Sequence, residues 1–159
     1  MDLIEHFKEQ AKKERKKIVL PEGNDERILA AAVEIDKEGI AEPIILGSAD
    51  VVSVTASKLN LKLGGVTVIN PENSPNLGKY AASYCKKREN ASEGMAMRLV
   101  KKNLMFGAMM VAEGDADGMV AGAANATASV LQAAILAIGF QKGISTPSSF
   151  FLMVVPECL

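Results

Sequence analysis

The sequence predicts an α/β fold, an open and mainly parallel sheet with helices on both faces. Short apolar segments alternate with longer stretches whose apolar residues recur at helical spacing, a rhythm typical of βαβ units. Apolar residues make up 48% of the 159 residues and aromatic residues only 4%, which indicates one domain with an aliphatic core. We therefore expect residues 1–159 to form a single α/β lobe.

Strands and helices alternate through the first half of the chain. The expected elements are helix 2–15, strand 17–20, a helix with Asn24 as its N-cap that ends at Gly39, strand 43–47, a helix from Ser48 through Leu59, and strand 66–69. Each helix follows a strand that is apolar on both faces, so a sheet covered by helices is predicted.

The second half is richer in helix. The expected elements are helices 77–88, 92–103 and 104–113, strand 118–122, a loop and helix over 123–138, and a strand over 148–155. The last strand has the strongest apolar pattern, and a strand buried on both faces needs helices to cover it. Because only a few residues follow it, we expect the chain to stop within a larger fold.

Charge and composition exclude several classes of function. The formal net charge of -1 gives no overall attraction to nucleic acid or to an anionic membrane. The N-terminus has no apolar signal-peptide region and no run is long enough to span a bilayer, so we expect a cytoplasmic protein with Cys85 and Cys158 as thiols. No metal-ligand motif is present, and the lone His6 is expected at the surface.

The strand-to-helix turn at residues 21–27 is the first candidate site. It follows the first strand, and open α/β sheets bind ligands at the carboxyl ends of their strands. One interpretation is direct contact with a substrate. The other is a well-capped helix start in which Arg27 pairs with a carboxylate.

A loop of small residues at 117–129 is the second candidate. Its glycine and alanines at 122–124 allow close approach of the backbone, and such a loop before a helix presents N–H groups to an oxyanion. Seventeen of the 18 Lys and Arg residues lie at or before Lys102, so a phosphate site here would depend on neutral donors. The neutral side chains are those of Asn125, Thr127 and Ser129. Plain packing of a helix against the sheet explains the pattern equally well.

A basic cluster at residues 86–88 is the third candidate. Cations at a helix C-terminus complement the helix dipole without any ligand, and a contact to a nucleotide phosphate is the alternative. Methionines at helical spacing are expected in the core rather than on a ligand surface; they are Met95, Met105, Met109 and Met110. No Ser/His/Asp set, nicotinamide motif or ATP motif is visible.

Three segments together resemble a known family. Residues 19–29 (VLPEGNDERIL) resemble the opening of bacterial phosphotransacetylases, also called phosphate acetyltransferases, and of phosphate butyryltransferases. Residues 116–123 (ADGMVAGA) resemble the family's strand and glycine turn, and residues 148–157 resemble the strand that follows. The resemblance covers essentially the whole chain but only about the first half of a family member.

The resemblance implies a dimer of two-lobed α/β subunits, related in fold to isocitrate and isopropylmalate dehydrogenases, with the active site between the lobes. The coenzyme A thiol attacks the carbonyl of acetyl phosphate, so coenzyme A is a substrate and neither a bound cofactor nor a metal is expected. The groups that take the thiol proton and hold the carbonyl come from the second lobe. No catalytic residue is therefore expected in this chain, which alone should be inactive.

For the first lobe, the resemblance implies supporting contacts to acyl-CoA and phosphate. Arg88 is the nearest match to an arginine that contacts coenzyme A, with Lys86 or Lys87 as alternatives, and Cys158 matches a cysteine near the site. Where the family usually has His, Ser/Thr, Asp and Arg around the next helix start, this chain has Asn125, Thr127, Ser129 and Gln132. Gln132 keeps a donor but lacks the charged, bidentate fork of arginine, which weakens any contact to phosphate.

Two other classes of function stay open. A non-catalytic module for coenzyme A or phosphate binding, or for dimerisation, would keep the fold without the missing lobe. A dehydrogenase relative would need metal-binding aspartates and an arginine cluster that the sequence does not show.

Overall fold

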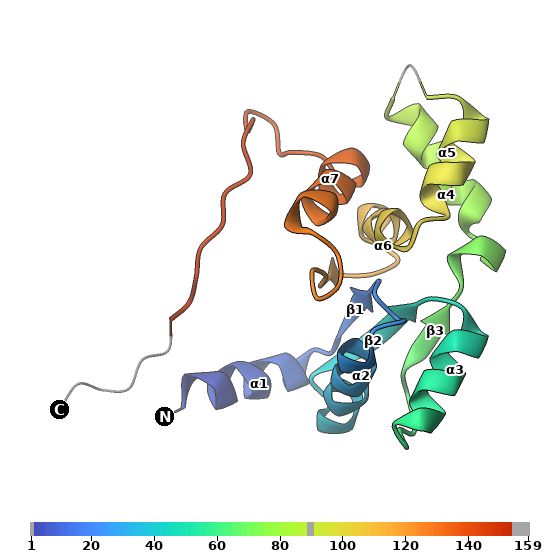
Figure 1. The fold of residues 1–159 in the computed structure, drawn as a ribbon. Coiled ribbons are helices and arrows are strands. Elements are labelled where there is room, and N and C mark those ends of the chain that lie inside the picture. Colours follow the sequence, from blue (N-terminus) through green and yellow to red (C-terminus); the bar gives the residue numbers. More distant parts are fainter. Residues whose placement is uncertain (1, 89–90, 154–159) are drawn as a thin grey trace.

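A four-stranded parallel sheet forms the centre of the fold, with helices on both faces (Figure 1). The structure is a computed structural model that describes residues 2–88 and 91–153. Its helices are α1 (Leu3–Lys13), α2 (Glu26–Glu38), α3 (Ala49–Lys58), α4 (Leu77–Lys86), α5 (Glu93–Val100), α6 (Asn103–Ala112) and α7 (Thr127–Ala137), with a 3-10 helix η1 (Pro71–Asn73). Its strands are β1 (Lys16–Leu20), β2 (Ala41–Leu46), β3 (Thr67–Ile69) and β4 (Gly118–Met119). The predicted α/β fold with a parallel sheet is confirmed, and the relation to isocitrate and isopropylmalate dehydrogenases stays a prediction.

The strand order brings two distant loops together. β1 lies between β2 and β4 in the order β3-β2-β1-β4, and Ile18 of β1 is opposite Pro43 of β2 and Gly118 of β4. Because every pair is parallel, all the carboxyl ends lie at one edge of the sheet, where α/β folds bind ligands. The loops that follow β1 and β4 are therefore neighbours.

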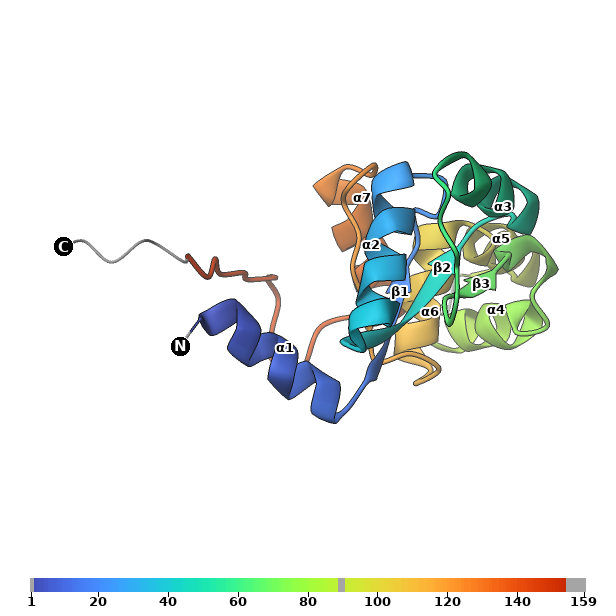
Figure 2. The same cartoon turned by 90° about the horizontal axis from the view of Figure 1, so that it is seen from below.

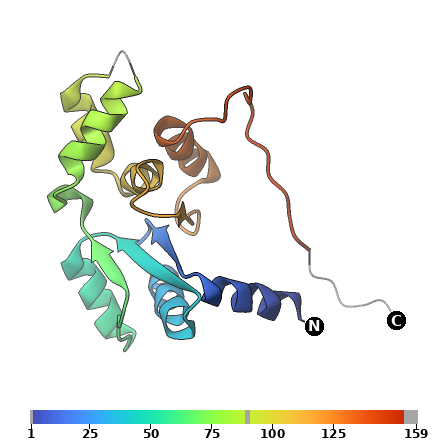
Figure 3. The same ribbon diagram turned by 180° about the vertical axis from the view of Figure 1, so that it is seen from behind.

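Two helical layers bury the two faces of the sheet. Successive side chains of β1 point to opposite faces. Leu20 packs with Leu29 of α2 and Val52 of α3, whereas Val19 packs with Phe106 and other residues of α4–α7. Figures 1 and 3 show α2 and α3 on one side of the sheet and α6 and α7 on the other. α1 has no buried residue and extends away from this body (Figure 2).

The methionine prediction is confirmed for α6 and wrong for α5. Met105, Met109 and Met110 are buried in the layer between α6 and its neighbours. Met95 is 49% exposed, because α5 turns Ala96 and Val100 inward instead. α6 lies on the sheet and is apolar all round, while α5 lies at the periphery with only one buried face.

One predicted N-cap, one predicted strand end and one predicted strand are wrong, and α5 ends at Val100 rather than at residue 103. Asp25, not Asn24, is the N-cap of α2, since its Oδ1 accepts the Arg27 N–H at 2.9 Å. β4 ends at Met119 rather than at residue 122. Residues 148–153 form no strand, and Phe150 and Phe151 are each 90% exposed. A strand needs a neighbour for its N–H and C=O groups, and the described residues offer this segment none. Residues 154 and 155 of that predicted strand lie outside the described residues.

Gly23 makes the closest backbone approach at the carboxyl edge, so alanine there is expected to destabilise the fold. A Cβ on Gly23 would lie 2.6 Å from the carbonyl oxygen of Leu46 and 2.5 Å from Cγ2 of Ile45. Such overpacking costs about 2 kcal/mol of unfolding free energy, measurable by urea denaturation. Gly78→Ala is the control, because a Cβ there meets nothing within 4 Å. Equal stabilities for Gly23→Ala and the wild type would contradict the packing argument.

Candidate functional site

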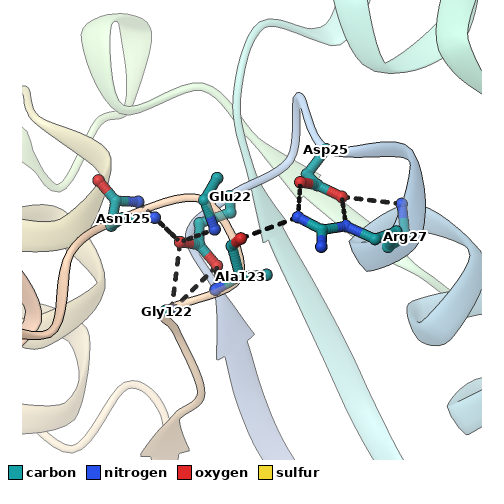
Figure 4. A network of polar contacts seen from close by, with 7 residues as sticks. Glu22, Asp25, Arg27, Gly122, Ala123 and Asn125 are labelled. Carbon is teal, nitrogen blue, oxygen red and sulfur yellow. Dashed lines mark hydrogen bonds and ion pairs between the residues drawn. The ribbon is translucent and has the colours of Figure 1, made fainter.

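Glu22 is the one charged side chain that is buried among residues 2–88 and 91–153, with 6% of its surface exposed. It lies in the loop after β1, and its carboxylate reaches the loop after β4 (Figure 4). A carboxylate without water needs hydrogen bonds or a counter-charge to stay ionised. Its partners therefore define the chemistry of this edge of the sheet.

Four consecutive backbone N–H groups donate to the Glu22 carboxylate. The donors are those of residues 122 to 125, at N···O distances of 3.1, 3.0, 2.9 and 2.7 Å in chain order. The side-chain Nδ2 of Asn125 donates a fifth hydrogen bond at 2.8 Å. Gly122 has a φ of +113°, which only glycine adopts readily, and this starts the turn of the loop around the carboxylate. The loop forms a nest for one carboxylate.

These hydrogen bonds keep Glu22 ionised. Burial alone raises the pKa of a carboxyl group, but the bonds from Ala124, Asn125 and Ala123 outweigh it and lower the pKa of Glu22 to about 2. The negative charge is therefore present across the physiological pH range. Five hydrogen bonds, rather than a single cation, stabilise the negative charge of Glu22.

The loop predicted as an oxyanion site does hold an anion, but one from its own chain. The N–H groups of residues 122–125 are used by Glu22 and are not free for a ligand. Neither interpretation of the second candidate was complete, because the loop combines anion binding with structural packing. The signal in the sequence was a glutamate after one buried strand and a small-residue loop after another.

Arg27 pairs with a carboxylate, as one interpretation of the first candidate predicted. Its guanidinium donates to Asp25 at 3.0 Å from Nε and 2.7 Å from Nη2, and to the carbonyl of Ala123 at 2.8 Å. The hydrogen bonds from Arg27 lower the pKa of Asp25 to about 2. Figure 4 shows this pair beside the Glu22 nest, so both ends of the 122–125 loop are tied to the turn after β1.

A cavity of about 650 Å³ lies beside the Glu22 nest. Its walls come from the turn after β1, the end of α5, the start of α6 and one side of α7. Apolar side chains such as Leu99, Leu104 and Leu136 form part of the lining. The polar lining includes Glu22, Asn24, Lys102, Asn125, Ser129 and Gln132. Apolar walls with a few convergent polar groups are typical of small-molecule sites.

The cavity brings together three of the six predicted contact residues. Asn125, Ser129 and Gln132 line it. Thr127 is exposed at the start of α7 and does not line it. Arg88 lies elsewhere, and Cys158 is outside the described residues.

Arg88 contacts a neighbouring helix. Its Nη2 donates to the carbonyls of Ile135 at 3.3 Å and Leu136 at 3.4 Å in the last turn of α7. A cation at a helix C-terminus needs no ligand, which agrees with the dipole interpretation of the basic cluster, although the helix is α7 rather than α4. Lys87 pairs with Glu113 at 3.5 Å.

Two polar residues of the cavity, Lys102 and Asn103, lie outside all three predicted candidate sites. Asn103, the first residue of α6, donates from Nδ2 to the carbonyls of Pro21 at 3.0 Å and Leu46 at 3.1 Å. It thereby satisfies two backbone groups where β1 and β2 end. Lys102, the N-cap residue of α6, is an exposed cation in the lining. No local pattern marks either residue, because their importance comes from where α6 meets the sheet.

The described residues contain neither a membrane-spanning helix nor a cluster of metal-ligating side chains. No described helix has the length and apolar character needed to cross a membrane. Within the same residues, no three His, Cys, Asp or Glu side chains come together as a metal site would require. The expectation of chemistry without a metal stays a prediction.

The chain is similar to proteins of one family along its length. The family model for Phosphate acetyl/butaryl transferase matches residues 2–159. A phosphate acetyltransferase from Thermoanaerobacterium thermosaccharolyticum is 41% identical over 160 residues, which covers 99% of this chain and 48% of that protein. One from Clostridium acetobutylicum is 36% identical over 162 residues, with 99% and 48% covered.

Solved structures agree with this similarity. A phosphotransacetylase from Staphylococcus aureus superposes with a TM-score of 0.85 at 36% identity, over 91% of this chain and 44% of that one. One from Streptococcus pyogenes gives a TM-score of 0.86 at 34% identity, over 92% and 46%. The chain thus spans about half the length of the relatives that it matches. It belongs to the phosphate acetyl/butyryl transferase family.

Proposed function

We propose that this chain supplies one lobe of an enzyme that transfers an acyl group between coenzyme A and inorganic phosphate. The observation that carries the proposal is the family match over residues 2–159, together with relatives named phosphate acetyltransferase. The cavity at the carboxyl edge is the proposed substrate site, since open α/β sheets bind ligands there. Acetyl-CoA or another short acyl-CoA, and phosphate, are the proposed ligands.

The proposed contacts fall into two groups. Asn125, Ser129 and Gln132 are supported by their place in the cavity, and Lys102 adds a cation that can form a charge-assisted hydrogen bond with phosphate. Arg88, Thr127 and Cys158 rest on the resemblance alone. A dimer in the cytoplasm, without a bound cofactor or metal, completes the proposal.

The chemistry needs a base that this cavity does not supply. The thiol sulfur of coenzyme A attacks the acetyl carbon of acetyl phosphate, the C–S bond forms, the C–O bond to phosphate breaks, and the thiol proton leaves. The acidic groups in the described lining are Glu22 and Asp25, each with a pKa of about 2. A thiol has a pKa of about 8.5, so carboxylates this acidic are poor proton acceptors for it. We infer that neither carboxylate is the base and propose that the second half of the two-lobed enzyme supplies it, as the family resemblance implies.

Gln132→Arg is expected to tighten phosphate binding about 5- to 10-fold, because a charge-assisted hydrogen bond replaces a neutral one. Isothermal titration of the 159-residue chain with inorganic phosphate measures this change. Gln141→Arg adds the same charge at an exposed residue that does not line this cavity and is the control. A similar gain in both variants would mean that net charge, not a contact in the cavity, governs phosphate binding.

A further inference from the structure

The Asn125 side chain is oriented by Glu22. Its Nδ2 donates to Glu22 Oε1 at 2.8 Å, and the opposite orientation would place Oδ1 against a carboxylate that only accepts. Figure 4 shows the amide nitrogen turned toward Glu22 and the amide oxygen turned away. Asn125 also lines the cavity, where this orientation offers a ligand the Oδ1 acceptor beside the second N–H of Nδ2.

The backbone of the same loop is closed to anions. All four N–H groups of residues 122–125 already donate to Glu22, which is ionised and 6% exposed. A phosphate placed against this loop would find no free backbone donor and would meet a buried negative charge at short range. This wall of the cavity therefore favours a ligand that donates hydrogen bonds.

Other residues of the lining carry hydrogen-bond donors. Lys102 and Gln132 line the same cavity and carry donors, one of them charged. The lining thus combines the acceptor of Asn125 with donors from α6 and α7. An acyl-CoA has both kinds of partner, since its pantetheine arm carries amide N–H groups and its other parts carry phosphates.

We propose that Glu22 is a positioning residue for substrate: it keeps the 122–125 loop closed to phosphate and turns Asn125 so that its carbonyl oxygen accepts from an amide N–H of acyl-CoA. This role rests on the proposed function and adds an orientation to it. Glu22 itself acts through Asn125 and the loop and contacts no reacting atom in this proposal.

Two ligands separate this role from a purely structural one. Isothermal titration measures the affinity for acetyl-CoA. Nuclear magnetic resonance follows the amide resonances of residues 122–125 as inorganic phosphate is added. Glu22→Gln, a neutral isostere, is expected to weaken acetyl-CoA binding about 10-fold, and Glu22→Asp, which keeps the charge, to recover part of that loss. Asp36→Asn is the matched control. Asp36 also accepts a hydrogen bond from a backbone N–H, that of Gly65 at 2.9 Å, but does not line the cavity. The Asp36→Asn variant should therefore bind acetyl-CoA with the affinity of the wild type.

The phosphate probe gives an independent result. Phosphate should leave the 122–125 resonances unmoved in the wild type and should shift them in Glu22→Ala, where the N–H groups become free. Shifts in the wild type, or none in a folded Glu22→Ala chain, would overturn the closed-loop role. Equal acetyl-CoA affinities of the wild type and Glu22→Gln would overturn the positioning of Asn125. If the wild type itself fails to bind acetyl-CoA, the proposed function fails, while the phosphate comparison still decides what Glu22 does to the loop.

Discussion

Replacing Glu22 by alanine is expected to lower the free energy of unfolding by about 3 kcal/mol at pH 7, which is a large part of the total stability of a single domain. The substitution leaves four backbone N–H groups and the Asn125 amide without their acceptor. The carboxylate that is lost is only 6% exposed, so water restores these hydrogen bonds only in part. Urea denaturation followed by circular dichroism measures the loss.

The same interaction makes part of the stability depend on pH. The pKa of Glu22 is about 2 in the fold against an ordinary value of 4.5. A lowered carboxyl pKa stabilises the fold fully above about pH 4.5, and this contribution is lost as the pH falls through about 2. The shift corresponds to about 3 kcal/mol. The stability difference between the wild type and Glu22→Gln should therefore shrink to less than half its neutral value at pH 3.

Glu72→Gln controls for the loss of one titrating carboxyl group. Glu72 is exposed, and no hydrogen bond or ion pair of its side chain occurs in the part of the chain that the structure describes. The free energy of unfolding of Glu72→Gln should equal that of the wild type at each pH measured. A difference between the wild type and Glu22→Gln that stays constant from pH 7 to pH 3 would show that shape, rather than the charge of Glu22, holds the loop.

Local patterns were sufficient to predict most of the fold. Spacing and apolar content predict the buried strands β1 and β2 and the amphipathic helix α2, because both signals depend on residues close in sequence. Residues 148–153 have an even stronger strand pattern but form no strand. An apolar pattern cannot supply the neighbouring strand with which the segment would have to pair. Propensity describes what a segment favours, and pairing decides whether it forms.

The candidate site was predicted less completely, because its main interaction joins residues far apart in sequence. The sequence marks the loop at 122–125 and the turn containing Glu22 as separate candidate sites. The spacing of residues along the sequence does not show that the Glu22 carboxylate binds the N–H groups of that loop. Ser129 and Gln132 line the cavity because α7 presents them there, and their contacts to a substrate stay a prediction. Arg88 does not line it, because the C-terminal carbonyls of α7 compete for the guanidinium.

The 159-residue chain alone is expected to release no coenzyme A thiol from acetyl-CoA and phosphate above the buffer rate. Its cavity holds no carboxylate basic enough to take a thiol proton, and a general base contributes typically about 10²–10⁴ in rate. A hybrid in which this chain replaces the matching half of the Thermoanaerobacterium thermosaccharolyticum enzyme should turn over. A thiol-specific reagent follows both reactions, and the difference should be at least about 100-fold.

The two measurements show whether the general base lies in this chain or in the second half of the enzyme. Turnover by the isolated chain would mean that the base lies within these residues, and the inference from the low pKa values of Glu22 and Asp25 would be wrong. A hybrid that folds and binds acetyl-CoA but stays inactive would favour a non-catalytic module. In that case Gln132→Arg in the hybrid is the decisive variant, because a neutral amide cannot supply the charge-assisted bond of an arginine. Recovery of turnover would place the loss at that one side chain, and continued inactivity would place it elsewhere in this lobe or in its junction with the second half.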